Sequence, residues 1–199
     1  MGVDKATVEF DGGLLVERAI GILREAGLPV AIAGNRQDLK NFAKIVNDLD
    51  TPKGPLGGIC GALKVTSVPY AVFLPVDLPM LPPALIEHMQ KVAHVTGSAV
   101  VVPSVNGFAQ TFPAVLHRSV LPTLKTELAA GRRGCFSAFQ VAAKALGQRV
   151  HVLATELLAQ TGQLNHDDGL PVARWFFNIN SVSDLESART FSRKLRLLP

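Results

Sequence analysis

The chain has 199 residues, of which 48% are hydrophobic and 18% charged, a balance that excludes a disordered protein and predicts one α/β domain over residues 1–199. No apolar run reaches the roughly 18 residues of a membrane span, and the first residues lack a signal-peptide pattern. The net charge is +4, and the lysines and arginines form no block with aromatic residues between them, a pattern that would indicate nucleic-acid binding. We therefore expect a cytoplasmic protein that binds neither membrane nor nucleic acid.

Hydrophobic periodicity predicts helices that alternate with strands along the chain. Such an alternation indicates right-handed βαβ units and a mainly parallel sheet. In chain order we expect helix 14–26, strand 29–34, helix 36–43, strand 45–47, helix 56–66, strand 70–76, helix 82–93, strands 98–103 and 112–116, helices 117–130 and 135–146, strand 149–153, an extended segment 175–180, and a last helix after the Ser181-x-x-Asp184 cap.

A glycine turn and the end of a strand are candidate parts of a functional site. Gly54, Gly57 and Gly58 surround the start of helix 56–66, where glycine permits close backbone approach. The apolar strand 70–76 ends on Asp77, directly before Leu78 and Pro79. Ligands of open α/β sheets bind outside the carboxyl ends of such strands, and a carboxylate there suits a hard cation. A plain loop and an ordinary turn aspartate are the alternatives.

Five short motifs recur in an order and at spacings that resemble the nucleoside-triphosphate transferases, and among them the molybdenum cofactor guanylyltransferases. The resemblance implies a Rossmann-like three-layer α/β sandwich and extends over essentially the whole chain. The motifs are Met1-Gly2-Val3-Asp4-Lys5, Asp11-Gly12-Gly13-Leu14-Leu15-Val16-Glu17-Arg18, Gly54-Pro55-Leu56-Gly57-Gly58, Asp77-Leu78-Pro79 and Asn178-Ile179-Asn180.

In that family a strand and a glycine-rich loop precede the segment that matches Met1–Lys5. Neither is present in this sequence, so we expect the sheet to lack its first strand and to expose an edge. Two explanations stay open: an internal methionine taken as the start of the chain, or a shortened protein with impaired activity.

The resemblance also implies roles for single residues. Lys5 matches the lysine that holds the nucleotide phosphates, and Asp77 matches the aspartate that binds Mg²⁺. Asp48, Gly54, Gly57 and Gly58 match the nucleotide site, with turn residues as the alternative for each. A family asparagine that helps to read the base corresponds here to Ala33.

Other polar residues suggest an acceptor site. Asn178 and Asn180 match a pair near the acceptor in the family, although Asn180 could instead cap the last helix. Arg132 and Arg133, in a glycine-flanked turn, could bind an acceptor phosphate or lie in solvent. The histidines have no metal-ligand spacing, and we assign them no metal.

The implied reaction moves GMP from GTP onto molybdopterin cofactor and releases pyrophosphate, with Mg²⁺ as the cofactor and Lys5 and Asp77 as catalytic residues. Transient contacts with proteins that make or receive the molybdenum cofactor are also implied. One alternative is a transferase that uses another nucleotide, such as CTP, or a phosphosugar acceptor. The other is a non-catalytic binding protein without the nucleotide loop.

Overall fold

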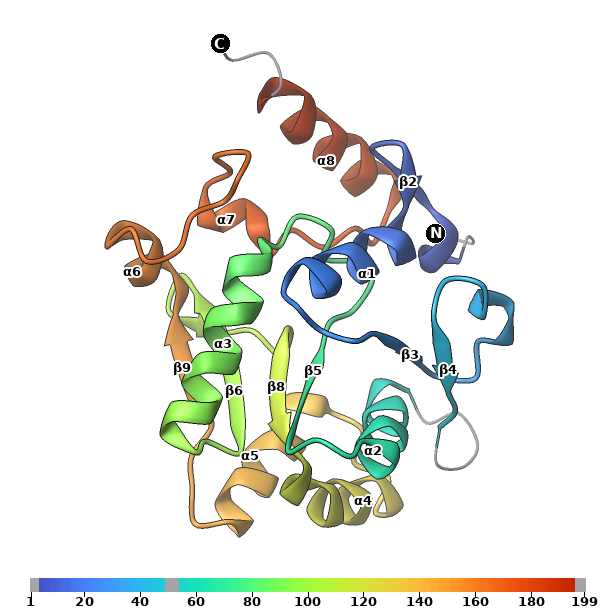
Figure 1. Ribbon diagram of the computed structural model, residues 1–199, viewed down its shortest axis with the longest axis vertical. Helices are drawn as coiled ribbons and strands as arrows, with labels where there is room; N and C mark the ends of the chain where they lie inside the picture. The colour runs from blue at the N-terminus through green and yellow to red at the C-terminus, as the bar shows by residue number, and fades with distance from the viewer. Residues whose placement is uncertain (1–3, 49–53, 196–199) are drawn as a thin grey trace.

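The computed structural model describes residues 4–48 and 54–195 (Figure 1). Met1, Gly2 and Val3 of the first predicted motif lie outside the described residues. Most of the predicted helices and strands are present, with ends that differ by a few residues. The helices are α1 Leu15–Glu25, α2 Pro55–Val65, α3 Pro83–Thr96, α4 Leu121–Ala129, α5 Cys135–Ala145, α6 Thr155–Gln160, α7 Val172–Trp175 and α8 Val182–Leu195, with short 3₁₀ turns at Lys5–Thr7, Gln37–Leu39 and Arg118–Val120.

The strands of the described residues form three sheets. A hairpin joins β1 (Glu9–Phe10) to β2 (Gly13–Leu14), and β3 (Ala31–Ala33) pairs in parallel with β4 (Lys44–Val46). The third sheet has the order β5-β8-β6-β7, and β9 also pairs with β6. Its strands are β5 Tyr70–Phe73, β6 Val100–Val105, β7 Phe108–Ala109, β8 Ala114–His117 and β9 His151–Ala154.

Strand direction in the large sheet confirms the α/β class. β9 pairs with β6 in parallel, and β5 and β6 each pair antiparallel with β8, so β5, β6 and β9 share one direction. The connection from β6 to β8 contains only the short strand β7, and a parallel crossover needs about a dozen residues or more. This short connection is the reason that β8 runs antiparallel to β5, β6 and β9.

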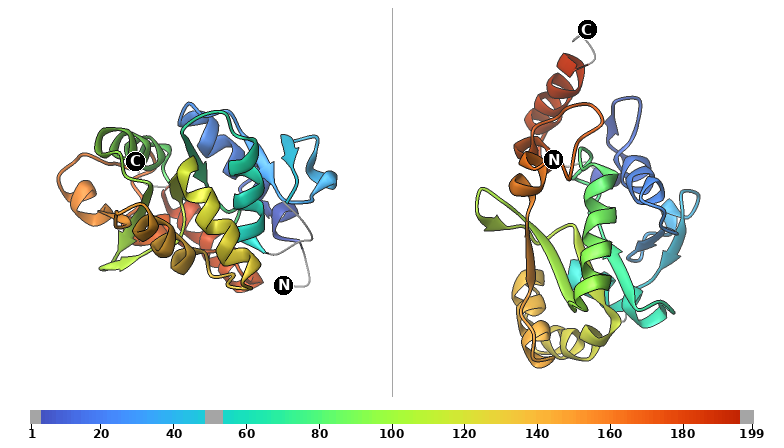
Figure 2. Two further views of the ribbon diagram at one scale, coloured as in Figure 1. Left: turned by 90° about the horizontal axis from the view of Figure 1, so that it is seen from below. Right: turned by 60° about the vertical axis from the view of Figure 1, so that its left-hand side comes forward.

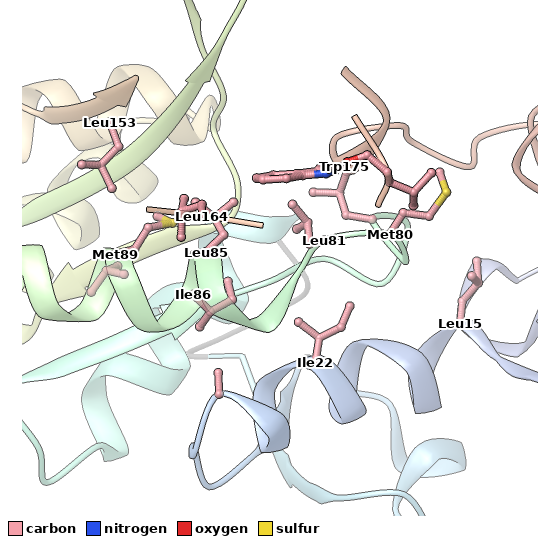
Figure 3. Packing of buried hydrophobic residues seen from close by; sticks show 14 of the residues in the cluster. Leu15, Ile22, Met80, Leu81, Leu85, Ile86, Met89, Leu153, Leu164 and Trp175 are labelled. Atoms are coloured by element: carbon pink, nitrogen blue, oxygen red, sulfur yellow. Dashed lines mark hydrogen bonds between the residues drawn. The ribbon is translucent and has the colours of Figure 1, made fainter. Parts of the chain in front are cut away.

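Helices cover both faces of this sheet, which gives the predicted three layers (Figures 1 and 2). Val101 and Val115 pack on the side of α1 and α3, in a cluster that also contains Ile86 and Trp175 (Figure 3). The alternate residues of the same strands, such as Val100 and Leu116, pack against α2, α4 and α5. Two hydrophobic cores on opposite faces hold the sheet, as the period of two along a strand requires.

In the described chain, β5 lies at one edge of the large sheet. Within residues 4–48 and 54–195, β5 pairs only with β8, and the β3–β4 pair forms a separate sheet. All four residues of β5 are half-buried rather than fully buried, although they are apolar or aromatic. The strand also ends at Phe73, before Asp77, so Asp77 lies in a loop and not at the last strand position.

Two local predictions are wrong. The segment 36–43 is not a helix, because the short connection between the parallel strands β3 and β4 leaves room for a single 3₁₀ turn at Gln37–Leu39. The segment 175–180 is not extended throughout. The indole N–H of Trp175 donates to the Leu170 carbonyl at 2.7 Å, where the helical turn Val172–Trp175 forms.

The described helices include none that is long and apolar enough to cross a bilayer.

Candidate functional site

Lys5, Asp77 and Asn180 meet although they are far apart in the sequence. The Lys5 Nζ donates to Asp77 Oδ2 at 2.9 Å and also to Asn180 Oδ1. Asp4 caps the turn that carries Lys5, because its Oδ1 accepts from the Ala6 N–H at 3.2 Å. An ammonium group thus lies between a carboxylate and an amide oxygen, just beyond the carboxyl end of β5.

The hydrogen bonds around Asn180 show which residues cap α8. Ser181 Oγ accepts from the Asp184 N–H at 3.1 Å, and Asp184 Oδ2 accepts from the Ser181 N–H at 2.8 Å. These contacts, first among them the hydrogen bond with Ser181, lower the pKa of Asp184. Ser181 and Asp184 therefore cap α8, and the side chain of Asn180 is left to accept from Lys5.

A cavity of about 350 Å³ opens beside Asp77. It combines aromatic rings, amide side chains and the Asp77 carboxylate, and one of the amides belongs to Asn178. Its lining residues are Pro55, Pro75, Asp77, Leu78, Gln110, Thr111, Phe112, Phe176 and Asn178. Asn178 and Asn180 thus both lie near Asp77, the former in the cavity and the latter through Lys5.

Asp48 belongs to a second group of residues, at the end of β4. Its Oδ1 is buried and has no hydrogen-bond partner among the described residues, and burial raises the pKa of its carboxyl group. Its backbone N–H donates to Asn35 Oδ1 at 3.2 Å. Leaving a buried acceptor unsatisfied is costly, so this oxygen is a candidate partner for a ligand N–H group.

The glycine turn connects the two groups of residues. Gly54 has a φ of 73°, which only glycine adopts without strain. A Cβ on Gly58 would lie 3.4 Å from both Ala33 Cβ and Asp48 Oδ1, so α2 passes close to the Asp48 group. Pro55, at the start of the same helix, lines the Asp77 cavity. The first turns of α2 therefore extend from one group to the other.

Arg132 is engaged elsewhere. Its Nε and one terminal nitrogen each donate to a carboxylate oxygen of Glu127 at 2.6 Å. Glu127 is buried, with 8% of its side chain exposed. The guanidinium thus neutralises a buried carboxylate, which opposes the predicted role of Arg132 in binding an acceptor phosphate.

Two residues near Asp77 had no signal in the sequence. They are Gln110 and Phe176, which line the cavity beside it. Gln110 follows a two-residue strand, and Phe176 follows a one-turn helix, so neither lies on a periodic element.

The oxygen donors are suited to Mg²⁺, which binds one or two carboxylates together with phosphate oxygens and water. Asp77 supplies a carboxylate and Asn180 an amide oxygen, and the Lys5 ammonium shows that positive charge is accommodated between them. No group of three or more histidine, cysteine, aspartate or glutamate side chains that could hold a metal is present in the described part of the chain. A metal here would therefore depend on oxygens of the substrate.

Comparison with known proteins identifies the class. The model of the MobA-like NTP transferase domain matches residues 1–151, and the chain belongs to this family. A molybdenum cofactor guanylyltransferase from Pseudomonas entomophila is 36% identical over 138 residues, which are 66% of this chain and 71% of that protein. Another from Vibrio atlanticus is 34% identical over 136 residues, which are 66% of this chain and 69% of that protein.

A solved structure shows the same fold. The molybdopterin-guanine dinucleotide biosynthesis protein A from Archaeoglobus fulgidus superposes with a TM-score of 0.76 at 21% identity, over 97% of this chain and 92% of that one. The predicted Rossmann-like α/β fold and the predicted family are confirmed.

Proposed function

We propose that this protein moves GMP from GTP onto molybdopterin cofactor in a Mg²⁺-dependent reaction. The observation that carries the proposal is the contact of the Lys5 ammonium with Asp77 and Asn180. It unites three of the segments by which the chain resembles guanylyltransferases, and the relatives named above bear that name. Because α2 connects the two groups of residues, we also propose that residues 1–199 work as one nucleotidyltransferase domain.

Asp77 is the proposed Mg²⁺ ligand, with the triphosphate supplying further oxygens. When bound, Mg²⁺ supplies charge neutralisation at the transferring phosphoryl group. Lys5 is placed to leave its contact with Asp77 and to donate to a phosphate oxygen instead. An ammonium group in that position stabilises the negative charge that develops during transfer.

The nucleotide is proposed to lie along the start of α2. Backbone N–H groups at a helix N-terminus favour phosphate, and Gly54 leaves room for it there, because no described atom beyond its chain neighbours lies within 4 Å of a Cβ placed on it. Gly57 and Gly58 are buried where α2 passes β3. The bare Oδ1 of Asp48 is then available to accept a hydrogen bond from the base.

The cavity beside Asp77 is proposed as the acceptor site. Phe112 and Phe176 present aromatic surface for a planar ring, and Gln110 and Asn178 present amides for its polar edge. A ring held there would place its phosphate next to Asp77. An acceptor phosphate oxygen then forms a bond to the α-phosphorus, the bond between the α-phosphorus and the bridging oxygen breaks, and pyrophosphate leaves with that oxygen. Positioning and charge account for this chemistry without a covalent enzyme intermediate.

A transferase for another nucleotide is the second candidate, and Ala33 favours it. Ala33 lies beside Gly58 and Asp48, where an asparagine would add an amide for reading the base. Without that amide, discrimination between bases rests on fewer hydrogen bonds.

Asp77→Asn tests the proposal, because an amide keeps the shape of the side chain but removes the charge that a hard cation needs. We expect at least about a hundredfold loss of turnover and an unchanged Tm. Product formation from GTP, molybdopterin and Mg²⁺ is measured by chromatography, with Glu87→Gln on the exposed face of α3 as the control. Turnover within about twofold of the parent would contradict the assignment of Asp77.

A further inference from the structure

The loop that carries Asp77 is rich in proline and largely buried. It connects β5 to α3 and contains prolines at positions 75, 79 and 82, each without a backbone N–H. Its side chains Leu78, Met80 and Leu81 are at most 4% exposed, and Figure 3 shows Met80 and Leu81 within the hydrophobic cluster. Backbone carbonyls in such a buried loop need donors from elsewhere.

Three distant segments supply these donors. The Asp77 carbonyl accepts from the Ile179 N–H at 3.0 Å, and the Pro79 carbonyl accepts from Arg18 Nε on α1 at 3.0 Å. The Met80 carbonyl contacts His166 Nε2 at 3.2 Å. The loop is thus held from three sides, within three residues of the Asp77 carboxylate.

The other ring nitrogen of His166 fixes the direction of its hydrogen bond. His166 Nδ1 lies 3.1 Å from the backbone N of Asp168, which can only donate. Nδ1 must therefore accept, the ring proton lies on Nε2, and Nε2 donates to the Met80 carbonyl. Burial lowers the pKa of His166, which favours the neutral ring that the accepting Nδ1 requires. The ring centroids of His166 and Trp175 lie 6.1 Å apart.

We infer that His166, assisted by Arg18, is a positioning residue that holds the Asp77 loop in place through the Met80 and Pro79 carbonyls. The inference rests on the proposed function only where it takes Asp77 as the metal ligand; the hydrogen bonds to the loop are observed in the structure. Groups that orient a metal ligand typically change metal affinity or activity by about 10- to 100-fold when they are lost. His166 has this role without touching substrate or metal.

The test compares three variants by amide hydrogen exchange of residues 74–82. His166→Phe keeps a ring against Trp175 and loses the Nε2 donor, whereas His166→Gln keeps a donor of similar reach. His88→Phe makes the same change at a half-buried histidine on α3, outside the loop. Loss of one hydrogen bond should speed exchange about three- to tenfold in His166→Phe alone. Unchanged exchange in folded His166→Phe, or equally fast exchange in His166→Gln, would overturn the inference.

A second measurement separates this inference from the proposed function. The Kd of Mn²⁺ in the presence of GTP, followed by electron paramagnetic resonance, should rise about tenfold in His166→Phe and recover in His166→Gln. If Asp77→Asn binds Mn²⁺ as tightly as the parent while His166→Phe still speeds loop exchange, the metal assignment fails and the positioning role stands. A parental Mn²⁺ affinity in His166→Phe, with the affinity lost in Asp77→Asn, would overturn the positioning role.

Discussion

Lys5 shows how a functional contact differs from a structural one. Its side chain is 37% exposed, and that of Asp77 is 19% exposed, so water screens their attraction. Exposed ion pairs contribute little to stability, typically below about 1 kcal/mol. Lys5 can therefore exchange Asp77 for a phosphate oxygen at low cost, whereas a fully buried pair would resist such an exchange.

Gln110 is a single residue that separates the two proposed binding sites, because it lines the acceptor cavity and not the glycine turn. In Gln110→Ala we expect the KM for molybdopterin to rise about five- to tenfold, as loss of one hydrogen bond implies. The KM for GTP should stay within twofold of the parent. Steady-state kinetics with each substrate varied in turn measure the two KM values. An equal rise in both would contradict the assignment of the cavity as the acceptor site.

The packing of α2 on β4 depends on one glycine. A Cβ on Gly61 would overlap the carbonyl oxygen of Asn47 and lie 3.3 Å from the Asp48 Cα. This close approach keeps Asp48 beside the start of α2. The residues that follow Asp48, at 49–53, lie outside the described part of the chain.

Gly61→Ala should therefore destabilise the protein by about 1–3 kcal/mol, the usual range for overpacking. The matched control is Gly21→Ala in α1, where a new Cβ would lie 3.9 Å from Glu25 Oε1, at ordinary van der Waals distance. There, removal of a mid-helix glycine should stabilise by about 0.5–1 kcal/mol. Urea unfolding measures the free energy of unfolding of both variants. If both variants changed it in the same direction, the close contact at Gly61 would not limit the packing of α2 on β4.

The ion pair between Arg132 and Glu127, near the connection of α4 and α5, makes the stability of the fold depend on pH. The hydrogen bond from Arg132 lowers the pKa of the buried Glu127, so the folded state favours the charged carboxylate. The resulting stability is complete above the ordinary glutamate pKa of about 4.3 and is lost as the pH falls through the lowered folded value.

Glu127→Gln should thus have a lower Tm than the parent at pH 7, with a difference that shrinks as the pH falls below about 4. Arg132→Met should show the same trend, because the pair needs both partners. Calorimetry from pH 7 to pH 3 measures the two differences. A Tm difference that stays constant over this range would mean that the ion pair is not its source.

At the scale of the whole molecule, the proposed site is an assembly of segments that the fold brings together. The turn with Lys5, the loop after β5, the start of α2, the end of β4 and the segment before α8 each supply part of it. These parts lie around the free side of β5, where the large sheet and the β3–β4 pair stay separate in the described chain. In the proposed site, selectivity for a base depends on how β3, β4 and α2 meet.

Ala33→Asn tests this arrangement, because position 33 lies beside both Gly58 and Asp48. An added amide should sharpen the preference for GTP over ATP and CTP by about tenfold, the factor that one well-placed hydrogen bond gives. The kcat/KM values for the three nucleotides, with molybdopterin as acceptor, are compared between parent and variant. A parent that prefers CTP, or ratios that do not change, would contradict the proposed base site.

The alternation of helices and strands, the cap of α8 at Ser181 and Asp184, and the glycine turn before α2 could all be predicted from the sequence. These features depend on local periodicity and turn chemistry, which neighbouring residues express directly. The family could also be predicted, because short motifs keep their order along the chain.

The direction of β8, the single turn in place of helix 36–43, and the bond of Asn180 to Lys5 depend instead on how the chain packs. The contact of Arg132 with Glu127 and that of His166 with the Met80 carbonyl also depend on packing. These contacts join residues on elements that are positioned by packing, and His166 and Met80 are 86 positions apart. Local patterns carry no information about such pairs, because the partners become neighbours only when the hydrophobic faces of the sheet are buried.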